Sequence, residues 1–199
     1  MRSIHELTEL FASLPGIGPR QARRIVQFII AADPSFREKL ANFLKEIGSL
    51  VSQCPSCFRF AEMPRDTFCK ICADNARDRK TLMVVEKDID IDGVEATDAY
   101  QGLYFVLGAL IPMARQKKNG PSPRKKELYA QIEKNDVSEI IFALSTTPEG
   151  DYTAREIMRE LKEKYPEVKT NLLGRGLSVG AEIEYADQET IRNALKNRA

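Results

Sequence analysis

Two CxxC pairs constrain this chain of 199 residues more than any other feature. Cys54 and Cys57 form the first pair, Cys69 and Cys72 form the second, and the chain has no further cysteine. Eleven residues separate the pairs, a length that lets both bind one tetrahedral metal ion. Four thiolates favour zinc over hard cations and leave no coordination position for water, so we predict one structural zinc per chain. A disulfide pair and an iron–sulfur cluster are the alternatives.

The composition is that of a globular protein, with 43% hydrophobic and 30% charged residues and a net charge of +1. No stretch approaches eighteen apolar residues, and the N-terminus lacks the apolar region and cleavage site of a signal peptide. We therefore expect a cytoplasmic protein. Residues 1–80 contain 13 Lys and Arg against 9 Asp and Glu, so a phosphate partner is expected to bind toward the N-terminus.

A glycine-containing hairpin joins two predicted helices near the N-terminus. Apolar residues recur at helical spacing in 4–11 and 22–30, and the sequence LPGIGPR lies between them. Glycines let a backbone approach a phosphate closely, and free N–H groups at a helix start favour an anion. The pattern resembles the helix-hairpin-helix family, which binds the DNA backbone without reading its sequence. The candidate DNA-binding residues are Gly16, Gly18, Arg20, Arg23 and Arg24. Alternatively, the glycines only form a turn, and the arginines lie on a solvated face of the second helix.

Residues 34–53 are predicted to form a further helix whose apolar side packs against the first helix pair. In the loop between the cysteine pairs, three phenylalanines alternate with basic residues: Phe58, Phe60 and Phe68 with Arg59, Arg65 and Lys70. Such interleaving can stack single-stranded nucleic acid. In so short a loop, however, we expect the phenylalanines to pack around the metal.

From residue 81 onward the pattern changes to α/β. The apolar runs 82–85 and 140–144 predict buried strands, and a third strand is expected at 168–173. Helices are expected in the low nineties, at 124–134 and at 153–164. This alternation predicts a mostly parallel sheet with helices on both faces. The fold class is thus α/β, in three parts: a helical helix-hairpin-helix region at 1–53, a small four-cysteine zinc finger at 54–78, and an α/β domain at 79–199. That its C-terminal end is an assembly segment is implied only by family resemblance.

Three carboxylates follow the two main strands, Glu86 after the first and Glu149 and Asp151 after the second. That edge of an open α/β sheet is where ligands bind. The arrangement resembles the Toprim domain of topoisomerases, primases and some nucleases, in which the first Glu can act as acid or base and the acidic pair holds magnesium. Here the pair reads Glu-Gly-Asp in place of the usual Asp-x-Asp, so magnesium is permitted but not assured. The alternative is that these carboxylates only cap the following helices.

The segment 88–93, DIDIDG, matches the opening of an EF-hand loop. Position twelve is Ala99, however, where a bidentate Glu is required, so we predict a helix start instead. The chain has no GxxxxGK[ST] phosphate loop, and its one histidine, His5, offers no catalytic dyad.

The order of these parts resembles the RecR family of bacterial recombination mediators, from about Leu7 to Leu195. The stretches that carry the resemblance are LPGIGPRQARR, CPSC, CKIC, VVE, YQGLYFVLG, EGDYTA and GRGLSVGAEIEYAD. The resemblance implies a non-catalytic DNA-repair protein at the bacterial nucleoid. It also implies a ring-shaped tetramer, built from dimers, that can encircle DNA and that works with RecO and RecF to load RecA at gaps.

Two departures from the family pattern concern partner binding and the ring lining. Residues 112–126 are more basic and proline-rich than expected, and DIDIDG replaces the usual start of the first Toprim helix. The rival function is a small magnesium-dependent Toprim nuclease. A chain of 199 residues has no room for the tyrosine domain of a topoisomerase or the template-binding module of a primase.

Overall fold

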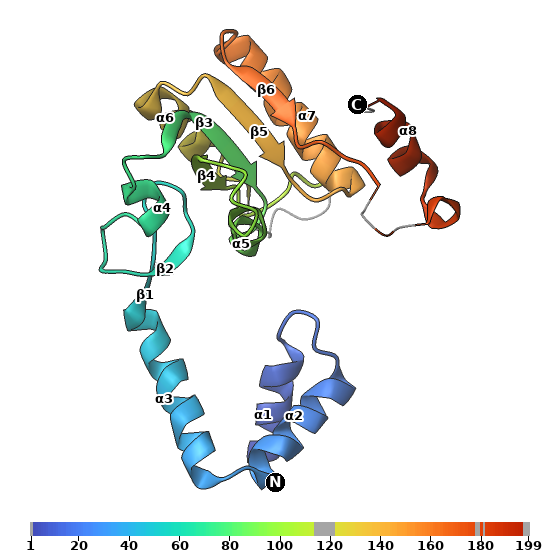
Figure 1. Cartoon of the computed structure of the whole chain (residues 1–199). Helices are drawn as coiled ribbons and strands as arrows, with labels where there is room; N and C mark the ends of the chain where they lie inside the picture. The colour runs from blue at the N-terminus through green and yellow to red at the C-terminus, as the bar shows by residue number, and fades with distance from the viewer. Residues whose placement is uncertain (1, 114–121, 178–179, 181, 197–199) are drawn as a thin grey trace. The chain divides into compact units, whose positions relative to one another are not determined.

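The computed structural model describes residues 2–113, 122–177, 180 and 182–196, and the chain divides into two compact units, Met1–Val51 and Ser52–Ala199 (Figure 1). Part of the basic segment 112–126 and part of GRGLSVGAEIEYAD therefore lie outside the described residues. No helix in the described part is long and apolar enough to cross a membrane.

The first unit contains the helices α1 (Arg2–Ala12), α2 (Pro19–Ala31) and α3 (Pro34–Leu50). Ala22 and Val26 on the inner side of α2 are fully buried. Gly16 makes the turn between α1 and α2 with a φ of 76°, a left-handed conformation that favours glycine. Pro19 occupies the first turn of α2, where its fixed φ suits a helix and its missing N–H costs nothing. The predicted helix pair and hairpin are confirmed.

Helix α3 differs from the prediction in two respects. It ends at Leu50 rather than at residue 53, because residues 51–53 form the short strand β1 (Val51–Gln53). We expected its apolar side to pack against α1 and α2, but no residue of α3 is buried. Contacts with α2 come from the start of α3: the rings of Phe28 and Phe36 meet edge to face at 5.8 Å, and the Arg37 guanidinium donates to the Ile30 carbonyl at 2.9 Å. From Phe43 onward the apolar side is exposed.

The second unit is built on a four-stranded parallel sheet in the order β4-β3-β5-β6. Its strands are β3 (Asp78–Val85), β4 (Gly102–Val106), β5 (Glu139–Ala143) and β6 (Lys169–Leu172), and its main helices are α5 (Ile89–Glu95), α6 (Lys125–Asn135) and α7 (Pro148–Lys164). Val85 lies opposite Val106 on one side and Ala143 on the other, so β3, β4 and β5 end at the same edge. The predicted parallel sheet is confirmed.

Alternate residues of the strands form two separate apolar clusters, one on each face of the sheet. On one face, Leu82 and Val84 pack with residues of α6 and α7, such as Leu128 and Ile157. The cluster on the other face contains Met83, Val85, Tyr104 and Val106 together with Ile91 of α5 and all four cysteines. Both faces are covered as expected, and the cysteine loop forms part of the second cover.

Smaller elements complete the second unit: β2 (Phe60–Glu62), which pairs with β1, α4 (Lys70–Ala73), a 3-10 turn (Ile183–Tyr185) and α8 (Gln188–Lys196). Helix α7 begins at Pro148, five residues before the predicted start. The Thr147 hydroxyl caps it by accepting a hydrogen bond from the Gly150 N–H at 3.1 Å. Glu149 and Asp151 therefore lie in the first turn of a helix and not in the preceding loop.

Candidate metal centre and nucleic-acid interface

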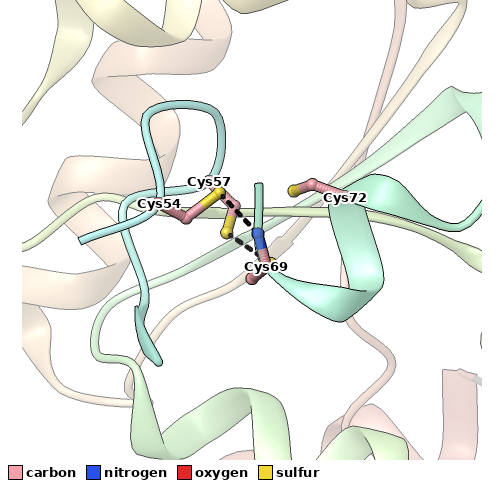
Figure 2. A group of neighbouring side chains, drawn as sticks. All are labelled: Cys54, Cys57, Cys69 and Cys72. Atoms are coloured by element: carbon pink, nitrogen blue, oxygen red, sulfur yellow. Dashed lines mark hydrogen bonds between the residues drawn. The ribbon is translucent and has the colours of Figure 1, made fainter. Parts of the chain in front are cut away.

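The four cysteines form a buried cluster in which all Sγ atoms lie within 4.8 Å of one another (Figure 2). Cys69 stands at the start of α4 and Cys72 within it, while Cys54 and Cys57 flank the turn after β1. The Cys69 N–H points to the Cys54 sulfur at 3.5 Å. Among the described residues, this is the only group of three or more His, Cys, Asp or Glu side chains placed to hold a metal ion.

The geometry of the cluster fits a single ion. All four cysteines are free, and the sulfurs of Cys57 and Cys69 are 3.6 Å apart, well beyond a disulfide bond. Four sulfurs at about 2.3 Å from one zinc lie about 3.8 Å apart. An iron–sulfur cluster, whose cysteines bind different irons, needs a wider spread. Without a metal, the hydrogen bond between Cys54 and Cys57 lowers the pKa of the first thiol and raises the pKa of the second.

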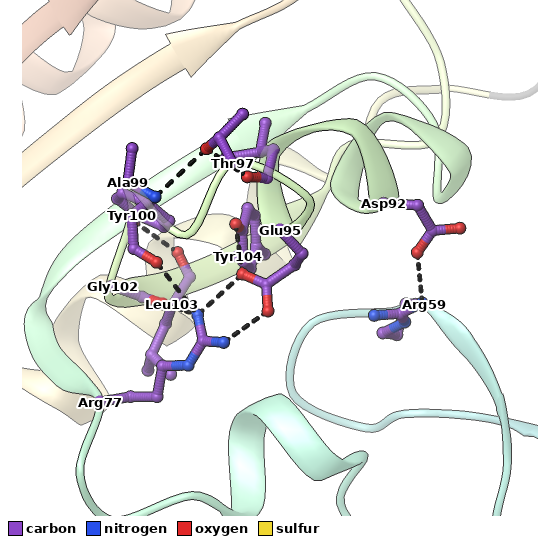
Figure 3. A network of polar contacts seen from close by, with 11 residues as sticks. Arg59, Arg77, Asp92, Glu95, Thr97, Ala99, Tyr100, Gly102, Leu103 and Tyr104 are labelled. Carbon is purple, nitrogen blue, oxygen red and sulfur yellow. Dashed lines mark hydrogen bonds and ion pairs between the residues drawn. The ribbon is translucent and has the colours of Figure 1, made fainter.

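Two aspartates at the start of α5, within the DIDIDG segment, bind the cysteine loop. The Arg59 guanidinium lies 3.4 Å from the Asp88 carboxylate and 3.2 Å from the Asp92 carboxylate, and the second pair is drawn in Figure 3. The Phe60 N–H donates to Asp88 at 2.5 Å. Residues 89–95 form a helix with two of the aspartates in its first turn, so the predicted helix start is confirmed and these carboxylates have a structural use.

A second network joins α5 to β4 and to the residue before β3. Both carboxylate oxygens of Glu95 accept from Arg77, at 2.9 and 2.5 Å, and the Tyr104 hydroxyl donates to the same carboxylate at 2.6 Å (Figure 3). The Arg77 guanidinium lowers the pKa of Glu95, and Glu95 in turn raises the pKa of Arg77. In addition, the Val106 N–H donates to the Cys57 carbonyl at 2.8 Å. The cysteine loop is thus fixed to the sheet by backbone, apolar and ionic contacts.

The three phenylalanines of the loop do not share one environment. Phe58 packs edge to face on Phe105 at 5.4 Å, as expected. Phe60 and Phe68 remain 59% and 48% exposed, so the expectation of packing around the metal is wrong for these two. The buried positions beside the sulfurs are taken by residues of the sheet and by Ile71 and Ile91.

The hairpin of the first unit presents the arrangement expected of a phosphate-binding site. Gly16, Gly18, Arg20, Arg23 and Arg24 are all exposed. Gly18 is the N-cap of α2, and no side chain of the described residues caps the helix there. The N–H groups of the first turn lack partners within the helix, which leaves them and the positive end of the helix dipole for an anion. Arg23 also lines a groove of about 740 Å³ between α1 and α2.

The three carboxylates predicted to converge lie at the C-terminal edge of the sheet but make separate contacts. Glu86 directly follows β3 and lies 3.5 Å from the Lys87 ammonium. Asp151, in the first turn of α7, forms an ion pair with Arg175, which lies beyond β6, and this guanidinium lowers the pKa of Asp151. Glu149 is exposed. The described residues contain no group in which these three carboxylates approach closely enough to share a metal ion.

Comparison with known protein families matches three parts of the chain, on either side of the cysteine loop. The model of the RecR helix-hairpin-helix matches residues 4–47, the Toprim domain matches 80–170, and the RecR C-terminal region matches 176–199. The protein named Recombination protein RecR from Amoebophilus asiaticus is 37% identical over 198 residues, covering 98% of this chain and 94% of its own length. The proteins of the same name from Bacteroides thetaiotaomicron and Chloroflexus aggregans are 39% and 35% identical, covering 94% and 98% of this chain and 89% and 92% of their own lengths. The chain belongs to the RecR family.

Two residues of this RecR-family chain were not singled out from the sequence. Gly150 is needed where α7 starts, because a Cβ there would lie 2.0 Å from the Ser145 carbonyl oxygen. In the sequence, the glycine between Glu149 and Asp151 was the signal that could have marked this position. Arg175 pairs with Asp151, which lies 24 positions earlier in the sequence. The position of Arg175 between two glycines was the signal in the sequence that could have pointed to it. The family assignment confirms the expected order of helix-hairpin-helix, cysteine loop and Toprim sheet.

Proposed function

We propose that this chain is a non-catalytic mediator of recombinational DNA repair that binds the DNA backbone through its N-terminal hairpin. Relatives of nearly the same length carry the name Recombination protein RecR. The observation that carries the proposal is the uncapped start of α2, where exposed glycine backbone and three exposed arginines gather. Following the family, the protein acts with RecO and RecF to load RecA at gaps.

The DNA interface is tested by replacing Arg20, Arg23 and Arg24 with alanine. Each lost phosphate contact should reduce the slope of log affinity against log salt by about 0.9 on duplex DNA, with a similar loss of affinity on every sequence. A matched control removes three exposed cations from α7, Arg155, Arg159 and Lys162, and should leave the slope nearly unchanged. A changed sequence preference with an unchanged slope would argue against backbone contacts.

We further propose that the cysteine cluster holds one structural zinc. Four buried sulfur donors at mutual distances suited to one tetrahedral ion support zinc and leave no open position for catalysis. The role of the ion is then to fold the loop and fix it against the sheet.

The protein is also proposed to assemble with itself, as a tetrameric ring built from dimers. The exposed apolar side of α3 supports this, because Phe43, Leu44, Ile47 and Leu50 are each more than half exposed within a single chain. A Phe43→Glu, Leu44→Glu variant should lower the mass measured by light scattering below that of the wild type, which is expected at four times 22.5 kDa. Lys45→Glu on the same helix is the control and should not change the mass. A wild type that stays monomeric at every concentration, with and without DNA, would contradict the ring.

The acidic edge is proposed to face a basic surface of a partner such as RecO. A Glu149→Gln variant, which leaves the ion pair of Asp151 with Arg175 intact, should keep its DNA affinity but lose partner binding or repair. Normal repair and partner binding by this variant would mean that the acidic residues only cap the helix. Magnesium is not favoured at this edge, because the described carboxylates do not gather into a metal-binding group. Cleavage of plasmid DNA with magnesium or manganese that is lost on Glu86→Gln would instead support the nuclease.

A further inference from the structure

We propose that Arg175 takes the place of a metal ion at the Toprim edge of this chain. Its guanidinium is the cation that neutralises Asp151, and the same contact anchors the segment after β6 to the start of α7. The starting point is the Toprim match over residues 80–170, which implies a magnesium ion beside the acidic residues of the edge.

The contacts of Asp151 disfavour that ion. The Nη1 group of Arg175 donates to Oδ2 of Asp151 at 3.3 Å, and Nη2 donates to Oδ1, so both carboxylate oxygens are engaged by one planar fork. The two side chains are only 23% and 26% exposed. Magnesium requires near-octahedral oxygen ligands at about 2.1 Å, and a second positive charge would be repelled by the guanidinium already present.

The remaining acidic residues do not offer an alternative set of ligands. Glu86 lies next to the Lys87 ammonium, and Glu149 is on the exposed side of the first turn of α7. Within the described residues, no three carboxylates at this edge lie close enough together to share an ion. The side chains present therefore do not fit the magnesium that the Toprim family implies.

Arg175 lies between the C-terminal edge of the sheet and the segment that follows β6. It lines a small cavity of about 80 Å³ together with Ser145 and Gly150, and also an outer cleft of about 480 Å³ that reaches Thr190 and Asn193 of α8. Just before it, the Leu173 N–H donates to the Phe142 carbonyl of β5 at 2.9 Å. The guanidinium thus stands between the strand ends and the C-terminal segment, and the ion pair fixes the path of residues 173–177.

The test uses Mn²⁺ as a paramagnetic probe on the full-length, zinc-loaded protein. Free Mn²⁺ is measured by electron paramagnetic resonance for the wild type, Arg175→Ala, Asp151→Asn and the double variant. Arg155→Ala removes a neighbouring cation of α7 and is the matched control, since Arg155 acts on Asp151 only through space. We expect no Asp151-dependent binding in the wild type or in Arg155→Ala. Arg175→Ala should gain a weak Mn²⁺ site that the double variant loses.

Hydrogen exchange gives an independent readout of the anchoring role. Amides of residues 173–177 should exchange at least about tenfold faster in Arg175→Ala and in Asp151→Asn, and at the wild-type rate in Arg155→Ala. Arg175→Gln keeps the bulk of the side chain and replaces Arg175→Ala if that variant does not fold. Wild-type Mn²⁺ binding that disappears in Asp151→Asn would overturn the proposal. So would an Arg175 variant that neither gains Mn²⁺ binding nor loosens residues 173–177.

Discussion

Replacing Cys69 with serine should destabilise the whole second unit and not only the loop that carries it. Cys69 is 3% exposed, and its sulfur lies 3.6 Å from that of Cys57. Structural zinc contributes about 10–16 kcal/mol of apparent binding free energy through four ligands, or about 2.5–4 kcal/mol per ligand. Because metal binding is coupled to folding, we expect Cys69→Ser to lower the free energy of unfolding by about that amount.

The extent of this effect follows from the apolar cluster that the cysteines share with the sheet. Met83, Val85 and Tyr104 belong to the same cluster as the four sulfurs, so a loosened loop uncovers one face of β3 and β4. Hydrogen exchange should therefore rise in residues 52–199 and stay unchanged in residues 1–51. Zinc content, urea unfolding followed by circular dichroism, and exchange are measured on the same samples.

A conservative change in the same loop controls for local damage. Thr67 is exposed and its hydroxyl donates to the Pro64 carbonyl, a bond that serine can keep, so Thr67→Ser should retain one zinc per chain and normal stability. A Cys69→Ser protein that lacks the metal and yet unfolds at the wild-type urea concentration would refute the reasoning. So would an effect confined to the loop itself.

Two further predictions concern the sheet and its helices. Arg77 lowers the pKa of Glu95, so this pair adds stability above the ordinary glutamate pKa of about 4.3 and loses it as the pH falls through the lowered value. Glu95→Gln should thus cost about 1.5–3 kcal/mol at pH 7 and much less at pH 3 in urea unfolding, and an equal cost at both would contradict the pairing. Gly150→Ala should cost at least about 1–3 kcal/mol, since its Cβ would meet the Ser145 backbone, whereas Gly93→Ala in α5 has open space and should be neutral or stabilising in the same assay. Equal stability of these two variants would contradict the close approach at Gly150.

The sequence predicted the elements that depend on local patterns. The continuous apolar run 82–85 indicated a buried strand, and the glycines at 16 and 18 marked the hairpin, because each signal lies within a few residues. The CxxC spacing predicted the sulfur cluster for the same reason.

What the sequence could not predict depends on contacts between distant residues. The apolar spacing of α3 correctly indicated an amphipathic helix, but it could not say that no residue of this helix is buried against the helix pair. Phe58 and Phe60 look alike in sequence, but Phe58 is half-buried against Phe105 whereas Phe60 is exposed. The role of Asp151 likewise depended on Arg175, whose place beyond β6 is fixed by the fold.

The central claim is that this protein is a non-catalytic clamp on DNA. The most direct test compares how much of the protein stays bound to circular DNA and to linear DNA. The protein is bound to a gapped circular plasmid, washed with high salt to remove backbone contacts, and the plasmid is then linearised with a restriction enzyme. We predict that washed complexes persist on the intact circle and are lost after linearisation, with no cleavage of the circle by the protein itself. Loss of the complexes from the intact circle in the salt wash, their persistence after linearisation, or cutting of the circle in the presence of magnesium would contradict the account.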